Sequence, residues 1–211
     1  MGIKFCNEKR FYFMLSCVLM SGLSLILCSV ALAGASTNNT TVISCNWAYG
    51  SNGNIDSYIG LKRAVTVIDD DDVSGENWKD MNCNGENYCD ECHDAGSDSL
   101  SSVALLFILN FVCVIQSYLR VTAARDMNTH KVVQLFCTGF SVLLAIISIG
   151  SFSNECINNL PDEFDYVHGP GYGCVATVLV FKIIEFLFHL CVPVEQKHAH
   201  EPVASVFSNR N

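Results

Sequence analysis

Hydrophobic residues along this chain gather into four long runs separated by polar segments, with no strand-like alternation inside the runs. The runs cover residues 11–33, 100–121, 132–152 and 172–193. Each is close to the roughly 20 mainly apolar residues that a helix needs to cross the hydrocarbon core of a membrane. Small residues inside the runs, such as Gly22, Gly139 and Ser141, allow close helix packing in lipid. The pattern predicts a mainly α membrane protein built on a four-transmembrane-helix bundle.

The first run has two interpretations. It follows Lys4, Lys9 and Arg10 and ends at residues 31–33 in Ala-Leu-Ala, the small-residue pattern of a signal-peptide cleavage site. Its apolar stretch of roughly 20 residues is longer than the roughly 7–15 of an ordinary signal peptide. We therefore expect an uncleaved span. In either case the chain after this run lies on the far side of the membrane.

The distribution of lysine and arginine gives the orientation of these spans. Cytoplasmic segments next to spans carry an excess of both residues. Here they lie before the first run and in the short link between the second and third, at Arg120, Arg125 and Lys131, whereas the loop after the third run has neither. We therefore expect cytoplasmic segments at 1–10, 122–131 and 194–211, and outer loops at 34–99 and 153–171.

Composition supports this division and narrows the classes of partner. Of 211 residues, 50% are hydrophobic and 16% are charged, and the formal net charge is −9. Of the 21 acidic residues, 12 lie in the first outer loop and 4 in the second. An acidic outer face argues against nucleic-acid binding. The expected partners are membrane lipid and other membrane proteins or further copies of this chain.

Residues 40–49 and 57–68 are rich in β-branched and aromatic residues and predict strands, and Gly-Ser-Asn-Gly-Asn at 50–54 predicts a hairpin turn. A small extracellular β-sheet formed by the first outer loop follows. Asn38 and Asn39 both begin N-x-T sequons, which predict glycosylation on the same side.

Half of the 12 cysteines lie in the outer loops, and an even number in an oxidising space predicts disulfides that brace the sheet. They are Cys45, Cys83, Cys89, Cys92, Cys156 and Cys174. The spacing favours Cys156–Cys174, which would close the second loop, with Cys45 bonded to one of the 83–92 group.

This topology, with a long first outer loop carrying strands and cysteines and a short second loop, resembles the claudin superfamily. That group includes peripheral myelin protein and the stargazin-like receptor auxiliary subunits. Its first-loop pattern is W…G-L-W…C…C. The matching residues here are Trp47, Gly60, Leu61, Cys83 and Cys89 or Cys92, while Lys62 stands in place of the second tryptophan. The resemblance implies lateral assembly, adhesion or attachment to a larger membrane complex.

Cys89, Cys92 and His93 match C-x-x-C-H, the pattern of covalent haem attachment. Together with Cys83 they also have the ligand types of a zinc site. We expect structural disulfides instead, because an oxidising exterior opposes free thiolates. The alternative function that this motif offers is an extracytoplasmic redox or metal carrier.

The acidic stretch from residue 69 to 80 resembles part of a calcium-binding loop. The candidate oxygen ligands are Asp70, Asp72, Ser74 and Glu76. Gly75 would supply the sharp turn, but Met81 stands where a bidentate glutamate is expected. The other interpretation is a solvated acidic turn.

Lys182, Glu185 and His189 interrupt the fourth run at spacings that place them on one helix face. Charges at this depth are costly unless they are paired or face the bundle interior. The set predicts either an ion pair that fixes packing, within the helix or shared with Gln116 of the second run, or a polar seam for an ion, a proton or a partner helix. A channel-forming oligomer is a further alternative.

The chain contains no nucleophile elbow, phosphate loop or H-E-x-x-H motif, so we expect no enzyme. The expected function is that of a structural or accessory protein of the plasma membrane, reached through the secretory pathway, with no cofactor. Exposed aromatic residues would anchor its contacts. The candidates are Trp47, Tyr49, Tyr58, Trp78 and Phe164.

Overall fold

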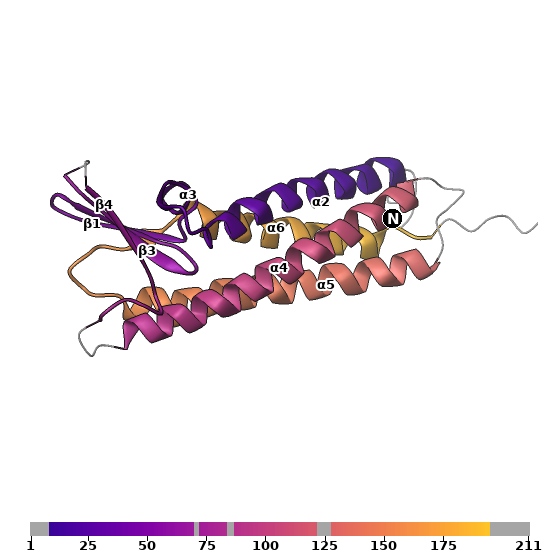
Figure 1. Ribbon diagram of the computed structural model, residues 1–211. Coiled ribbons are helices and arrows are strands. Elements are labelled where there is room, and N and C mark those ends of the chain that lie inside the picture. Colours follow the sequence, from indigo (N-terminus) through magenta and orange to yellow (C-terminus); the bar gives the residue numbers. More distant parts are fainter. Residues whose placement is uncertain (1–8, 70–71, 84–86, 122–127, 195–211) are drawn as a thin grey trace, which may run out of the picture.

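The computed structural model describes residues 9–69, 72–83, 87–121 and 128–194, and Figure 1 shows four long helices side by side with a small sheet at one end. The helices are α2 (Arg10–Ala33), α4 (Tyr88–Val121), α5 (Asn128–Ser151) and α6 (Pro170–Cys191). All four are long and apolar enough to cross a membrane, so the chain has the build of a multi-pass membrane protein. The four-helix prediction is confirmed.

The bundle is apolar outside and largely polar or small inside. Helices α2 and α5 each pack against both α4 and α6. Large apolar side chains point outward and are exposed, among them Leu19, Phe111, Phe136 and Leu187. The inward face of α2 carries Ser21, Ser24 and Cys28 instead. This inverted arrangement suits lipid, where small residues permit close packing and apolar side chains meet the acyl chains.

Helix α4 begins at Tyr88, well before the expected start of the second span at Leu100. The polar segment before residue 100 is helical because its buried positions continue the stripe of the span, every three or four residues. These positions are Cys89, Cys92, Gly96, Ser99, Val103, Leu106, Asn110, Cys113, Ser117 and Arg120. Acidic residues in the first turn also favour a helix N-terminus. Its 34 residues extend roughly 50 Å, so α4 is longer than a hydrocarbon core of about 30 Å requires.

The sheet has five strands in the order β4-β3-β2-β1-β5, all antiparallel. The strands are β1 (Ala48–Asn52), β2 (Ile55–Ile59), β3 (Arg63–Ile68), β4 (Asp72–Asn77) and β5 (Val167–His168). The predicted hairpin is present, since Asn52 pairs with Ile55 and Gly53 supplies a φ of 62° in the turn. Strand β5 comes from the second outer loop, so the expectation of a sheet formed by the first loop alone was incomplete.

Residues 40–44 are helical, which contradicts the strand predicted there. Helix α3 (Asn39–Ser44) begins at Asn38, whose side-chain oxygen accepts a hydrogen bond from the backbone N–H of Thr40 at 2.9 Å. This N-cap satisfies a donor that a strand would leave open. Local capping therefore outweighs the β-propensity of the Thr-Thr-Val-Ile stretch.

Helix α5 continues past Ser151 through a π-helical turn, η2 (Phe152–Cys156), and a 3₁₀ turn, η3 (Ile157–Asn159). The turn η2 packs against α4. It thereby carries Cys156 to the side of α4, next to the sheet.

Candidate functional site

We call the five strands, α3 and the segments that connect them to one another and to the long helices the cap. Trp47, just before β1, lies where the cap meets the bundle and is fully buried. Its indole Nε1 donates to the carbonyl oxygen of Ala31 in α2 at 3.0 Å, and its ring centroid lies 5.0 Å from that of Phe152 in η2 and 6.3 Å from that of Tyr172 in α6. One side chain thus joins three parts of the bundle to the sheet. The expectation that Trp47 is an exposed contact anchor was wrong.

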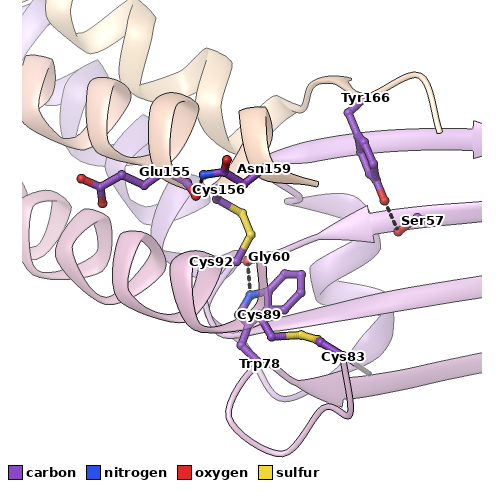
Figure 2. The surroundings of a disulfide bond; sticks show 10 residues. All are labelled: Ser57, Gly60, Trp78, Cys83, Cys89, Cys92, Glu155, Cys156, Asn159 and Tyr166. Carbon is purple, nitrogen blue, oxygen red and sulfur yellow. Dashed lines mark hydrogen bonds between the residues drawn. A yellow bond between two sulfur atoms is a disulfide. The ribbon is translucent and has the colours of Figure 1, made fainter. Parts of the chain in front are cut away.

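Trp78, just after β4, is also buried, with 2% of its surface exposed, which corrects the same expectation for this residue. Its Nε1 donates to the carbonyl oxygen of Gly60 at 3.2 Å, as Figure 2 shows. Nearby, α4 comes so close to the β2–β3 connection that a Cβ on Gly96 would overlap the carbonyl oxygen of Leu61. Both tryptophan side chains are therefore buried, and other residues form the surface of the cap.

The remaining predicted anchors, Tyr49, Tyr58 and Phe164, are half-buried on the cap. Tyr49 and Tyr58 pair across β1 and β2, with ring centroids 5.0 Å apart. The Tyr49 hydroxyl donates to Oδ1 of Asp56 at 2.8 Å, and this hydrogen bond raises the pKa of Tyr49 above its ordinary value. Phe164 lies 5.7 Å from Tyr166, whose own pKa is raised by burial.

Two disulfides brace the region between the cap and the bundle: Cys83–Cys89 and Cys92–Cys156 (Figure 2). The second joins α4 to η2, residues 64 apart in sequence. The favoured Cys156–Cys174 pair is therefore wrong, as is a bond from Cys45 to the 83–92 group, because the partners are already taken. Cys45 and Cys174 are both half-buried thiols.

Both cysteines of the C-x-x-C-H motif take part in these disulfides. Cys89 and Cys92 lie on the first turns of α4 and are bonded to different partners, so neither thiol is available to a haem vinyl group or to zinc. His93 is partly exposed and its Nδ1 lies 3.2 Å from Oδ1 of Asp94. Within residues 9–69, 72–83, 87–121 and 128–194, no group of three His, Cys, Asp or Glu side chains could hold a metal ion.

The expected calcium loop is a strand over its described part. Asp72, Ser74 and Glu76 alternate along β4, which pairs with β3 from Asp72 to Asn77. An extended strand cannot wrap its ligands around one ion as a calcium loop does. Asp70 lies outside the described residues.

The two sequons lie at the start of α3. Asn38 is exposed and caps the helix, while Asn39 is half-buried, with its side-chain oxygen close to Gly75 of β4. Glycosylation of either residue stays a prediction.

A charged cluster, defined here as Arg10, Arg120, Lys182, Glu185 and His189, lies inside the bundle with every member buried. Near the middle of α6, Lys182 Nζ lies 2.7 Å from Glu185 Oε2. The Ser21 hydroxyl of α2 accepts from Nζ at 3.0 Å and lies 3.0 Å from both carboxylate oxygens. The ion pair predicted within the helix is thus present, and a serine from the first span completes it.

The other half of the charged cluster lies toward the end of the bundle away from the cap. Arg120 of α4 lies with its guanidinium 2.8 Å from His189 Nδ1 and donates at 3.4 Å to the carbonyl oxygen of Val192. Because a guanidinium only donates, Nδ1 accepts, and the imidazole proton is on Nε2. Arg10 of α2 in turn donates to the Arg120 carbonyl oxygen at 2.7 Å. These contacts join α2, α4 and α6.

Sequence reasoning assigned Gln116 to this cluster and missed Ser21 and Arg120. Gln116 instead accepts from Nδ1 of His130 in α5 at 2.7 Å. Arg120 was assigned to the cytoplasmic link between the second and third runs, although its position on the stripe of buried residues of α4, every three or four residues, marks it as inward-facing. Ser21 carried no comparable signal, since small residues recur along all four runs.

Polar atoms lacking a hydrogen-bond partner within the described residues also face the interior, from α2, α4, α5 and α6. They are Ser24 Oγ, Asn110 Oδ1, Ser117 Oγ, Gln134 Oε1, Ser148 Oγ and His189 Nε2. Polar side chains are therefore buried at several levels of the bundle, among apolar ones such as Leu106 and Val178, and the Lys182–Glu185 pair lies near the middle of α6. No protein-family model matches the chain, and a search of curated proteins also finds no match.

Proposed function

We propose that this chain is a structural or accessory protein of the plasma membrane, in which the bundle is the anchor and the cap contacts other membrane proteins or further copies of itself. The observation that carries this proposal is the construction of the cap. One sheet draws strands from both outer loops and is fixed to the bundle by Trp47 and by the Cys83–Cys89 disulfide, which ties the segment after β4 to α4. A surface held this rigidly loses little conformational entropy when a partner binds.

The cap also presents groups that a partner can use. Strand β4 is the edge of the sheet, and its residues are exposed along almost the whole strand. An open edge offers backbone N–H and C=O groups to another chain. Tyr49 and Tyr58 add half-buried aromatic surface on β1 and β2, farther across the same sheet. Both features suit a protein that binds other proteins.

Charge marks one part of the cap as distinct. The first outer loop carries only three lysines and arginines, and two of them, Lys62 and Lys79, line a cavity of about 400 Å³ together with His93. Asp80 is the one acidic residue among the described residues that line it. In an otherwise acidic cap, this cavity is the favoured contact for an acidic group of a partner.

The outer placement of the cap is supported by the disulfides, which persist in oxidising compartments, and by the lysine and arginine residues near the opposite end of the bundle. A claudin-like relationship is supported by the same arrangement of spans and loops. Of its motif residues, Trp47, Gly60 and Leu61 are all buried where the sheet meets the bundle. Such a relationship would favour lateral assembly in the membrane.

Site-specific photo-crosslinking in intact cells tests the proposal. A photoreactive amino acid at Tyr58 should give a covalent adduct of discrete mass with a second protein or a second copy. The matched control is the same amino acid at Leu143, which is 56% exposed on the outward face of α5 and should label lipid. A Lys62→Ala/Lys79→Ala variant should weaken the Tyr58 adduct more than Asp162→Ala, an exposed charge elsewhere. A cap that yields no protein adduct, on a chain that is monomeric by native mass spectrometry, would contradict the proposal.

A further inference from the structure

Two outer cysteines meet at the place where the cap joins α6. Cys45 ends α3, two residues before Trp47, and Cys174 lies in the first turns of α6. One follows α3 in the first outer loop and the other lies near the start of α6, far away in sequence. Each is half-buried and reduced in the structure.

Backbone contacts hold the two segments together. Gly171 N–H donates to the Asn46 carbonyl oxygen at 2.8 Å, and Gly169 N–H donates to the Trp47 carbonyl oxygen at 2.9 Å. A Cβ placed on Gly171 would lie 2.8 Å from the Cys45 carbonyl oxygen, which rests directly against this helix turn. These backbone contacts hold the start of α6 against residues 45–47.

Cys174 follows Gly171 by three residues, so the two share one face of α6 and lie about 5–6 Å apart. The face that touches the Cys45 backbone is therefore the face that carries the Cys174 thiol. A disulfide needs Cα atoms about 4.4–6.8 Å apart, so its two cysteines must come from segments in direct contact, as these segments are.

We propose that Cys45 and Cys174 form a third outer disulfide, which locks the beginning of the cap to the beginning of α6. The bond forms by thiol–disulfide exchange with a donor protein disulfide of the oxidising compartment. The Cys45 thiolate attacks the donor disulfide and releases one donor thiol. The Cys174 thiolate then attacks Cys45 Sγ and releases the second donor thiol. The donor leaves as a dithiol that has gained two electrons, while the chain loses two electrons and two protons.

This bond would join different elements from those that Cys92–Cys156 joins. The known disulfide ties α4 to η2, whereas the proposed one ties the end of α3 to α6. Together with Cys83–Cys89, which ties the segment after β4 to α4, it would hold the cap to two helices of the bundle. All six outer cysteines would then be paired. The inference rests on the outer placement of the cap described under the proposed function.

Peptide mapping tests the pairing directly. Membranes are solubilised with N-ethylmaleimide to block free thiols, and the protein is digested and analysed before and after reduction. We expect a peptide pair linking Cys45 to Cys174 beside one linking Cys92 to Cys156. If Cys92–Cys156 is found while Cys45 and Cys174 carry maleimide, the inference fails and the outer placement stands. If all of these cysteines carry maleimide, the outer placement fails with it. A bond from either cysteine to a different partner also overturns the inference.

Single-cysteine variants give a second readout. A membrane-impermeant maleimide-polyethylene glycol should not label the wild-type cap on intact cells. It should add one label to Cys45→Ser, through Cys174, or to Cys174→Ser, through Cys45. The double variant should take no label and unfold at a temperature lower by roughly 5–10 °C. Cys191→Ser, at the opposite end of α6, is the matched control and should behave as wild type. Labelling of the wild-type cap, or a double variant with an unchanged unfolding temperature, contradicts the lock.

Discussion

The cap and the charged cluster both contain charged side chains, but the two regions hold them in opposite ways. Lys79 and Asp162 of the cap are exposed, so water screens and solvates them. Lys182 and Glu185 are fully buried, and each relies on the other at 2.7 Å and on Ser21. The chemical type of a residue therefore says little about its importance for stability here. What counts is whether water can replace a lost partner.

Removing one half of the buried pair should have the largest effect on stability. Glu185→Leu leaves the Lys182 ammonium without its counter-charge, which should destabilise the protein by about 3–5 kcal/mol. The double variant Lys182→Leu/Glu185→Leu should recover most of this loss, because no uncompensated charge stays buried. Unfolding in detergent, followed by circular dichroism, measures both.

The same variants separate a packing role from an ion pathway. If the pair only fixes packing, the double variant keeps its fold and its contacts with partners. A conductance of the wild-type protein in planar bilayers that disappears in the folded double variant would instead favour a channel. A double variant as unstable as Glu185→Leu alone would contradict the account of the pair.

The next largest effect should come from the disulfides beside the cap, where covalent bonds rather than buried charges hold the structure together. Removing Cys92–Cys156 by double alanine substitution should cost about 4 kcal/mol, because the bond closes a long loop. Removing Cys83–Cys89, whose partners are 6 residues apart, should cost about 2 kcal/mol. Unfolding curves of the two double variants test this order. Equal losses would show that chain entropy does not govern these bonds.

A matched pair of serines on α2 tests the buried side at smaller scale. Ser21→Ala removes the hydroxyl that bridges Lys182 and Glu185 and should cost about 1–3 kcal/mol. Ser29→Ala is the control, since its exposed hydroxyl bonds only the Leu25 carbonyl oxygen of its own helix. The control should be nearly neutral. Equal losses for both would mean that the Ser21 contact contributes nothing specific.

Exposed charges of the cap should show a much smaller effect. Lys79→Ala and Asp162→Ala are each expected to shift the unfolding temperature by less than about 2 °C. Differential scanning fluorimetry in detergent is sufficient to measure this. A shift comparable with that of Ser21→Ala would erase the distinction between the two regions.

The smallest effect concerns the titration of Tyr49. Because the protonated phenol donates to Asp56, its raised pKa means that this contact is complete below the ordinary tyrosine pKa and is lost as pH rises through the folded value. Absorbance of tyrosinate should therefore show a late-titrating component that Tyr49→Phe removes. Asp56→Asn should move that component to lower pH, and no movement would contradict the assignment.

Much of the architecture could be predicted from local sequence. Four apolar runs of span length predict four helices, because the hydrocarbon core fixes the length that an apolar helix needs. The turn at Gly53 was equally predictable, since glycine favours its positive φ. The pairing of Lys182 with Glu185 also follows from the sequence, because residues three apart share a helix face.

Several features depended on neighbours far away in the chain. The segment 88–99 is helical because its small and cysteine residues continue a stripe that packs against η2, and strand β5 forms because the second loop reaches β1. Disulfide pairing cannot be obtained from spacing, since Cys92 and Cys156 are adjacent only after α4 and α5 have packed.

Local hydropathy and charge therefore account for the four apolar helices and for the acidic composition of the segments around the sheet. By contrast, packing between distant segments determines that Trp47 and Trp78 are buried and that Arg120 contacts His189. The physical reason is that solvation of a side chain depends on what other segments cover it. Hydropathy along the chain specifies which segments can form membrane-spanning helices, whereas packing specifies which face of each helix is buried.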